Sequence, residues 1–219
     1  MENKRGAQKF TFLEALFVAV LIFGIGILAG VWLESYRGSK IASLYSNAEI
    51  SLLDMKSTES FIELVSCDKA TPELINFADR IYNEAKLLEK YDGASRLSES
   101  LIATHRRYDL LRASLFLASL KTKERCNATY NIIAYFYDYL EPEIKVSSRQ
   151  KVFSNYLLKL KKSRPEEDII LIPLAADNSL ASVDILLKKY NITELPTILV
   201  DEKLKITSIE DLEKIKSII

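Results

Sequence analysis

The chain has 219 residues, and its 30 basic residues are balanced by 30 acidic ones, so its net charge gives no reason to expect nucleic acid as a partner. Six glycines and five prolines beside 48% hydrophobic residues exclude a disordered chain and favour helix-rich globular structure. Two cysteines and one histidine leave little material for a zinc site or a catalytic triad. We therefore expect no catalytic residues, no metal and no cofactor, and an enzymatic activity is the less favoured interpretation.

An uncharged segment near the N-terminus is the first predicted element. No charged residue occurs from Ala15 to Leu33, and residues 10–33 form a helix long enough to cross the ~30 Å hydrocarbon core of a bilayer. Glu14 lies near the N-terminal edge, where its carboxylate can reach the headgroups. A cleaved signal peptide is the alternative, but its apolar region runs only about 7 to 15 residues and ends at a small-residue cleavage site. The segment is therefore predicted to be an uncleaved, single-pass transmembrane anchor.

The basic residues that flank this segment predict its orientation. Three of them precede the segment and two follow it closely: Lys4, Arg5 and Lys9 on one side, Arg37 and Lys40 on the other. Since Lys and Arg are enriched on the cytoplasmic side of a span, residues 1–9 are expected to be a cytoplasmic tail. The C-terminal bulk of the chain is then expected on the outer face of the cell membrane.

Small residues form a strip along the predicted anchor. Ala15, Ala19, Gly26 and Gly30 fall within about 60° of one another at 100° per residue. Small residues four positions apart let two membrane helices approach closely, so one interpretation is self-association or packing against a membrane partner. The other interpretation, which stays open, is that glycine is simply common in membrane helices.

Residues 40–123 are predicted to form three antiparallel helices. Apolar residues recur at three- and four-residue steps from Ile41 to Val65, after a junction at Arg37-Gly38-Ser39. A second helix is expected to start at Thr71-Pro72, with a capping side chain before a proline at the first helical position, and to end at Asp92-Gly93. A third is expected over residues 94–120.

Residues 126–219 change to a pattern in which strands alternate with helices. Strands are rich in β-branched and aromatic residues, and the run at 169–175 is continuously apolar, as in a strand buried on both faces. The predicted strands are 130–137, 169–175, 195–200 and 204–206, and the predicted helices are 146–162, 180–190 and a last one capped by Ser208. This βαβαββα order predicts an α/β domain.

One segment of this domain resembles a known family. Residues 189–200 read Lys-Tyr-Asn-Ile-Thr-Glu-Leu-Pro-Thr-Ile-Leu-Val, which is similar to the thioredoxin superfamily, where a helix ends in a Tyr-x-Ile stretch and a cis-proline precedes the next strand. The resemblance covers residues 126–219. It implies a thioredoxin-like fold in which Leu195, Pro196 and Thr197 bind an extended polypeptide.

The chain departs from this family at the redox site. Where the family carries Cys-x-x-Cys, residues 138–143 read Asp-Tyr-Leu-Glu-Pro-Glu and contain no cysteine. Thiol–disulfide exchange needs an attacking thiolate and a resolving thiol, and neither tyrosine nor carboxylate replaces them. The resemblance therefore implies a thioredoxin-like domain that has lost its redox chemistry.

The two cysteines lie outside this loop. Cys67 is expected near the end of the first soluble helix and Cys126 just after the third, so an up-down-up arrangement places both near the same end. A structural disulfide is the favoured interpretation; two independent thiols and a catalytic pair stay open. His105 stands beside two arginines, which favours a solvated basic face over a ligand or a general base.

These observations leave three function hypotheses, of which the third is an anchor subunit of a larger membrane complex whose partners depend on the strip with Gly26 and Gly30. The first is a single-pass membrane protein whose redox-inactive thioredoxin-like domain acts as an interaction or scaffold module, with a protein partner or a second copy bound through the membrane helix. The second is a membrane-tethered thiol–disulfide oxidoreductase accessory that uses Cys67 and Cys126.

Overall fold

The computed structural model describes residues 3–219 except 63, 96–98, 141 and 165–168. It is a mixed α/β protein with an apolar N-terminal helix and a C-terminal four-stranded mixed sheet. The chain divides into two compact units, residues 1–43 and residues 44–219.

The N-terminal helix, α1 (Asn3–Ile62), contains the predicted anchor. Its stretch Phe12–Tyr36, 25 residues, is long and apolar enough to cross a membrane. The helix continues through Arg37-Gly38-Ser39, where the sequence predicts a junction. A single glycine costs a helix only about 1 kcal/mol relative to alanine, which is too little to end it without a second breaking signal.

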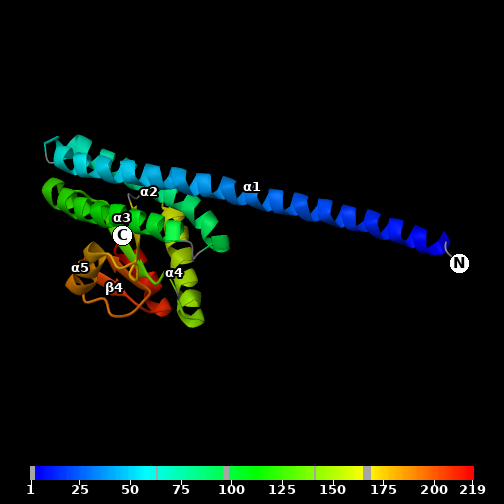
Figure 1. Cartoon of the computed structure of the whole chain (residues 1–219). Helices are drawn as coiled ribbons and strands as arrows, with labels where there is room; N and C mark the ends of the chain where they lie inside the picture. Colours follow the sequence, from blue (N-terminus) through cyan, green and yellow to red (C-terminus); the bar gives the residue numbers. More distant parts are fainter. Residues whose placement is uncertain (1–2, 63, 96–98, 141, 165–168) are drawn as a thin grey trace. The chain divides into compact units, whose positions relative to one another are not determined.

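Two long helices follow, α2 (Cys67–Ser95) and α3 (Glu99–Cys126; Figure 1). The second helix begins four residues before Thr71, so the predicted start at Thr71-Pro72 is wrong. The carbonyl of Ser66 accepts from the backbone N–H groups of Lys69 and Ala70, at 3.0 Å each, and starts the first turn. Pro72 lacks a backbone N–H, so one hydrogen bond is missing in this early part of the helix, but its fixed φ is compatible with the helix.

The C-terminal part has the predicted element order. Strand β2 (Ile169–Ala175) pairs parallel to β1 (Asn131–Tyr137), β3 (Thr197–Val200) pairs antiparallel to β1, and β4 (Leu204–Ile206) pairs antiparallel to β3. Their spatial order is β2-β1-β3-β4. The last helix is of the 3₁₀ type, and the Ser208 hydroxyl accepts from the backbone N–H of Glu210 at 3.4 Å, as a cap should. The elements are β1 (Asn131–Tyr137), α4 (Ile144–Ser163), β2 (Ile169–Ala175), α5 (Ala181–Lys189), β3 (Thr197–Val200), β4 (Leu204–Ile206) and η1 (Ile209–Ser217).

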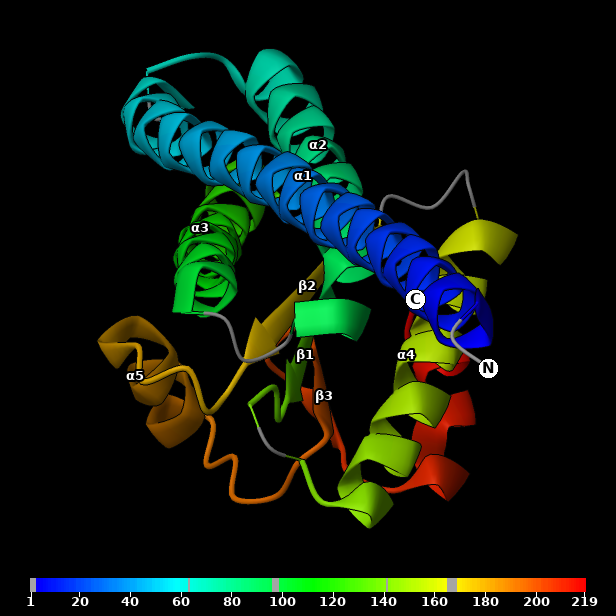
Figure 2. The ribbon, with the colours of Figure 1, turned by 45° about the vertical axis from the view of Figure 1, so that its right-hand side comes forward.

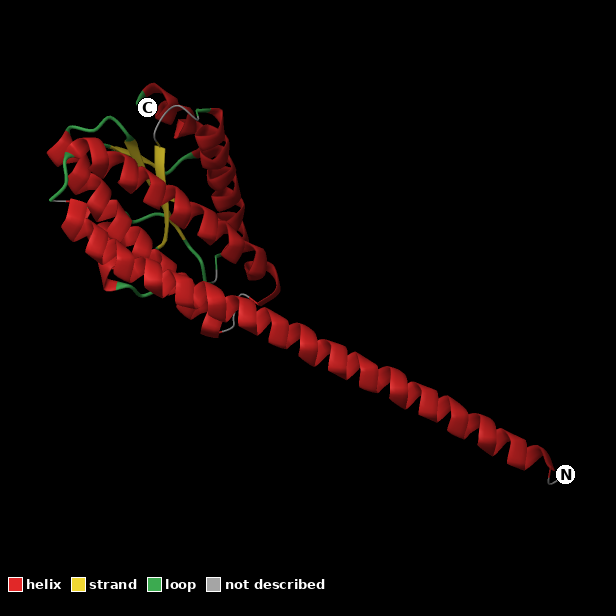
Figure 3. Cartoon of the chain, turned by 90° about the horizontal axis from the view of Figure 1, so that it is seen from above, coloured by secondary structure: helices red, strands yellow, loops and turns green. Residues whose placement is uncertain are grey.

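Helices cover both faces of the sheet, as Figures 2 and 3 show. Successive side chains of a strand point to opposite faces, so Ile132, Ala134 and Phe136 pack with α2, α3 and α5. Ile133 and Tyr135 pack on the other face with α4 and η1. This three-layer arrangement explains why β1 and β2 are apolar on consecutive residues.

Candidate functional site

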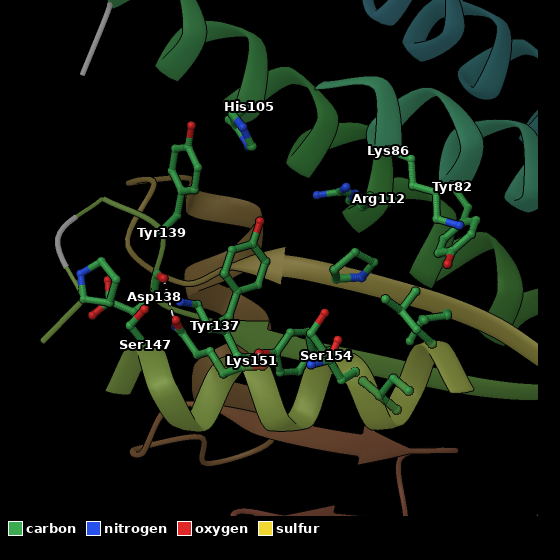
Figure 4. A pocket seen from close by; sticks show the side chains of 18 residues that line it. Tyr82, Lys86, His105, Arg112, Tyr137, Asp138, Tyr139, Ser147, Lys151 and Ser154 are labelled. Atoms are coloured by element: carbon green, nitrogen blue, oxygen red, sulfur yellow. Dashed lines mark hydrogen bonds between the residues drawn. The ribbon is translucent and has the colours of Figure 1, made fainter. Parts of the chain in front are cut away.

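A cavity of about 280 Å³ lies in the unit formed by residues 44–219, beside the edge strand β2 (Figure 4). Leu171 and Pro173 line it from β2, and further lining residues come from α2, α3, the end of β1, the loop after β1 and α4. Its volume is near the lower end of the range of about 300 to 1,000 Å³ that is typical of small-molecule sites. The fold therefore brings six separate segments to one concave site.

Tyrosine rings form much of the cavity wall. Tyr135 and Tyr137 are two residues apart on β1, which places both on the same face, and their rings stack with centroids 5.6 Å apart. The Tyr135 hydroxyl donates to the Gln150 carbonyl at 3.1 Å, and burial raises the pKa of this phenol. Tyr139 packs against the His105 ring with centroids 3.9 Å apart. These contacts fix the orientation of the aromatic wall from β1, α3 and α4.

Basic side chains enter the cavity from three helices. Lys86 of α2 lies over the ring of Tyr82, with its ammonium nitrogen 4.5 Å from the centroid. Lys151 of α4 is exposed at the mouth, and Arg112 of α3 is only 5% exposed. Figure 4 shows Arg112 and Lys86 entering from the α2 and α3 side and Lys151 from the opposite side. The cavity thus carries positive charge on facing walls.

A fully buried carboxylate holds Arg112 in place. One guanidinium nitrogen of Arg112 donates to Asp109 at 3.2 Å, and Asp109 also accepts from the side-chain amide of Asn178 at 2.6 Å and from the backbone N–H of Ala175 at 3.4 Å. Burial raises the pKa of Asp109, and the charge of Arg112 opposes that rise. This network joins α3 to the end of β2 and positions the guanidinium at the cavity.

A pair of acids, Asp138 and Asp177, holds the loop after β1. Asp177 accepts from the backbone N–H groups of Tyr139 at 2.9 Å and of Leu140 at 2.6 Å. The side chain of Asp138 hydrogen-bonds to that of Asp177, and burial together with this neighbour raises the pKa of Asp138 to about 6. The side-chain amide of Gln150 donates to the Asp138 carbonyl at 2.8 Å. The loop after β1, residues 138–143, is thus tied to α4 and to the segment after β2. Of its residues, Glu141 lies outside the described part of the chain.

The sequence-predicted binding residues do not line the cavity, and Thr197 begins β3, which pairs with the edge of β1 opposite to β2. The Leu195–Pro196 peptide bond is cis, and Thr197 pairs with Phe136 at the start of β3. Leu195 is half-buried, whereas Pro196 and Thr197 are buried, and the Thr197 hydroxyl donates to the Glu194 carbonyl at 2.5 Å. Leu195 is therefore the member of this trio with side-chain surface for a partner.

The two cysteines are joined to each other. Cys67 and Cys126 form a disulfide with their Cα atoms 5.4 Å apart. Cys126 ends α3 a few residues before β1 begins, whereas Thr197 adjoins the other end of β1. A seven-residue strand rises by about 20 Å. The disulfide and the cis-proline segment are thus separated by the length of β1.

The expectation for His105 is wrong, because this side chain is only 4% exposed and lines the cavity. Residues 101, 104, 105, 108, 111 and 112 of α3 are all buried and recur at helical spacing. The flanking arginines concealed this periodicity in the sequence. No sequence motif marks four further residues of the cavity, because they come from three separate helices: Tyr82, Lys86, Arg112 and Lys151.

The strip of small residues on α1 is exposed along its length. Ala15, Ala19, Gly26 and Gly30 all present their surface outward, and a Cβ atom added at either glycine meets no atom within 4 Å. Space for close approach of a second helix is therefore present at these positions.

Among the residues that the structure describes, no group of three or more His, Cys, Asp or Glu side chains could hold a metal ion. Comparison of the chain with protein-family models, with curated proteins and with solved structures finds no match in any of the three.

Proposed function

We propose that this chain is a single-pass membrane protein whose C-terminal unit has a redox-inactive thioredoxin-like fold and acts as an interaction module. The observation that carries the proposal is the position of its sulfur atoms. Both cysteines of the sequence are used in the Cys67–Cys126 disulfide, and the segment at 138–143 contains none. A domain without a thiolate beside its cis-proline segment can bind a polypeptide but cannot exchange disulfides with it.

The thioredoxin-like assignment is supported by the element order and by the cis-proline. The βαβαββ order followed by a terminal helix, with β3 antiparallel to β1, and the cis bond before Pro196 are the features on which the resemblance rests. The ladder of β3 begins at Thr197, so Leu195 lies outside it. An extended polypeptide that pairs its backbone at Leu195 is the partner that this surface favours.

The disulfide also favours an outward-facing C-terminal unit. Disulfides persist outside the cytoplasm and are rare within it. The basic residues that precede the membrane-spanning stretch favour the same orientation. We therefore place the C-terminal unit on the outer face of the cell membrane. Protease digestion of sealed, right-side-out vesicles tests this orientation. Digestion of the C-terminal unit only after the vesicles are opened would contradict it.

Polypeptide binding is tested with the full chain in nanodiscs and a fluorescently labelled, unfolded, carboxymethylated protein as the probe. Leu195→Ala removes the half-buried side chain next to the cis-proline and is expected to weaken binding about tenfold, because a lost apolar contact of this size is worth roughly 1 to 2 kcal/mol. Leu117→Ala, at an exposed leucine of α3, is the matched control and is expected to leave affinity unchanged. Equal affinities for both variants and the parent chain would contradict the assignment of the binding surface.

Association of the membrane helix is tested separately. Gly26→Leu with Gly30→Leu fills the small-residue strip without a clash inside one chain, and it is expected to abolish self-association measured by energy transfer in vesicles. Gly24→Leu, about 160° from Gly26 on the helix, is the control that should leave association intact. Unchanged association in the double variant would remove the helix strip as an interface.

The alternative function is a membrane-tethered oxidoreductase accessory in which Cys67 and Cys126 cycle between disulfide and dithiol. The existence of the disulfide is the observation that favours it, since a bonded pair is what the oxidised state of such a protein would hold. It predicts turnover that depends on Cys67.

A further inference from the structure

We propose that the tyrosine-lined cavity beside β2 binds a small, single-ring aromatic carboxylate. Leu195, Pro196 and Thr197 are not among the residues that line the cavity, and the proposal requires neither the thioredoxin resemblance nor polypeptide binding.

The size and wall of the cavity define the ring. A volume of about 280 Å³ holds one aromatic ring with a short substituent and is small for a fused-ring nucleotide-type ligand. Four tyrosines line it and give its wall aromatic surface against which a flat ligand can pack: Tyr82, Tyr135, Tyr137 and Tyr139. Tyr135 and Tyr139 are more than nine-tenths buried and already held by neighbours, so little side-chain freedom is lost when a ring packs against them.

The charges around the cavity define the anionic group. Arg112 is paired with Asp109 behind it. Among the described lining residues Lys86, Arg112 and Lys151 are basic and Asp138 is acidic, so basic side chains outnumber acidic ones in the cavity wall. Lys86 and Lys151 reach it from α2 and α4, on facing walls. Either ammonium group can donate a charge-assisted hydrogen bond to a carboxylate in the cavity.

Hydroxyl and amide groups complete the recognition. Ser147, Ser154 and Asn155 line the α4 side of the cavity and supply neutral donors near Lys151. A carboxylate has about four acceptor sites, which one lysine cannot satisfy. The mixture of aromatic wall, neutral donors and lysines therefore selects an aromatic carboxylate over an aliphatic acid, which would lack the stacking, and over an aromatic amine, which would be repelled.

The test uses three probes of equal ring size and different charge: 4-hydroxyphenylacetate, 4-methylphenol and tyramine. Binding of each to the full chain in zwitterionic nanodiscs is measured by isothermal titration calorimetry. 4-Hydroxyphenylacetate is expected to bind at least about tenfold more tightly than the neutral probe, because a hydrogen bond to a charged group contributes more than a neutral one, and tyramine is expected to bind most weakly. Equal affinity for all three, or tighter binding of tyramine, would overturn the proposal, as would no binding of any probe.

Two variants locate the binding. Lys151→Gln changes an exposed side chain, so it leaves the fold intact, and is expected to weaken 4-hydroxyphenylacetate binding about fivefold with little effect on 4-methylphenol. Lys159→Gln, on the same helix but outside the cavity, is the matched control and is expected to change neither affinity. Tyr137→Leu removes a wall ring and is expected to weaken both probes equally. Equal effects of the two lysine variants would show that the anion binds elsewhere and would contradict the cavity site.

Discussion

The Cys67–Cys126 disulfide is expected to stabilise the C-terminal unit without taking part in binding. The two cysteines are 59 residues apart in the sequence, and closing a loop of that length removes conformational entropy from the unfolded chain worth about 4 kcal/mol in the chain-entropy model. A typical domain has a free energy of unfolding of only about 5 to 15 kcal/mol. Removal of the bond should therefore lower the stability by a large fraction without abolishing the fold.

The measurement is urea unfolding of the full chain in nanodiscs, followed by near-ultraviolet circular dichroism. Cys67→Ala with Cys126→Ala is expected to lower the free energy of unfolding by about 4 kcal/mol, with each single variant losing a similar amount because either one opens the same loop. Below the transition, the double variant is expected to bind unfolded polypeptide as tightly as the parent chain. A loss below about 1 kcal/mol, or a loss of binding while the domain is still folded, would refute this assignment of a structural role.

Three further changes test polar contacts within the C-terminal unit. Arg112→Met leaves the buried carboxylate of Asp109 without its cation and is expected to lower the free energy of unfolding in urea by about 3 to 5 kcal/mol. Adding Asp109→Asn to the same chain is expected to restore most of this loss. No restoration would contradict the pairing. Because the pKa of Asp138 is raised from 3.8 to about 6, the folded state holds a proton that the unfolded state has lost, so stability falls as pH rises from about 4 to about 6. Because solvent screens this carboxyl, we expect the free energy of unfolding to change by only ~1 kcal/mol over that range. An Asp138→Asn variant with the same pH slope in urea unfolding would contradict this prediction. Asp201→Ala removes the carboxylate that accepts from Lys123 at 2.7 Å and from the backbone N–H of Ile132 at 2.9 Å. We expect it to lower the free energy of unfolding in urea by about 1 to 3 kcal/mol, and a loss near zero would contradict a structural role for these bonds.

Much of the fold follows from the sequence because its strands carry a strong local signal. The run at 169–175 has the residue bounds of β2, and 204–206 those of β4, since apolar and β-branched residues there match a sheet buried between helices. Helix ends were harder to predict, since a single glycine costs a helix too little to end it and a proline is tolerated near a helix start. The apparent junction at Arg37-Gly38-Ser39 and the apparent start at Thr71 illustrate this.

The cavity could not be predicted from the sequence, because it depends on how separate helices pack. Arg112 and Lys151 are 39 positions apart along the chain, and neither belongs to a motif. His105 has a signal in hindsight, since it shares a buried helical face with Leu101, Tyr108 and Arg112. The two arginines beside it favoured the interpretation as a solvated basic face instead. The disulfide was easier to predict, since an antiparallel arrangement of three helices brings the two cysteines to the same end.

The central claim is that this chain binds without thiol chemistry, and the rate at which the full-length protein in nanodiscs reduces insulin disulfides in the presence of dithiothreitol tests it most directly. A rate equal to that of dithiothreitol with empty nanodiscs, unchanged by Cys67→Ser, is the expected result. A rate above that background that Cys67→Ser abolishes would contradict the claim and establish the oxidoreductase alternative.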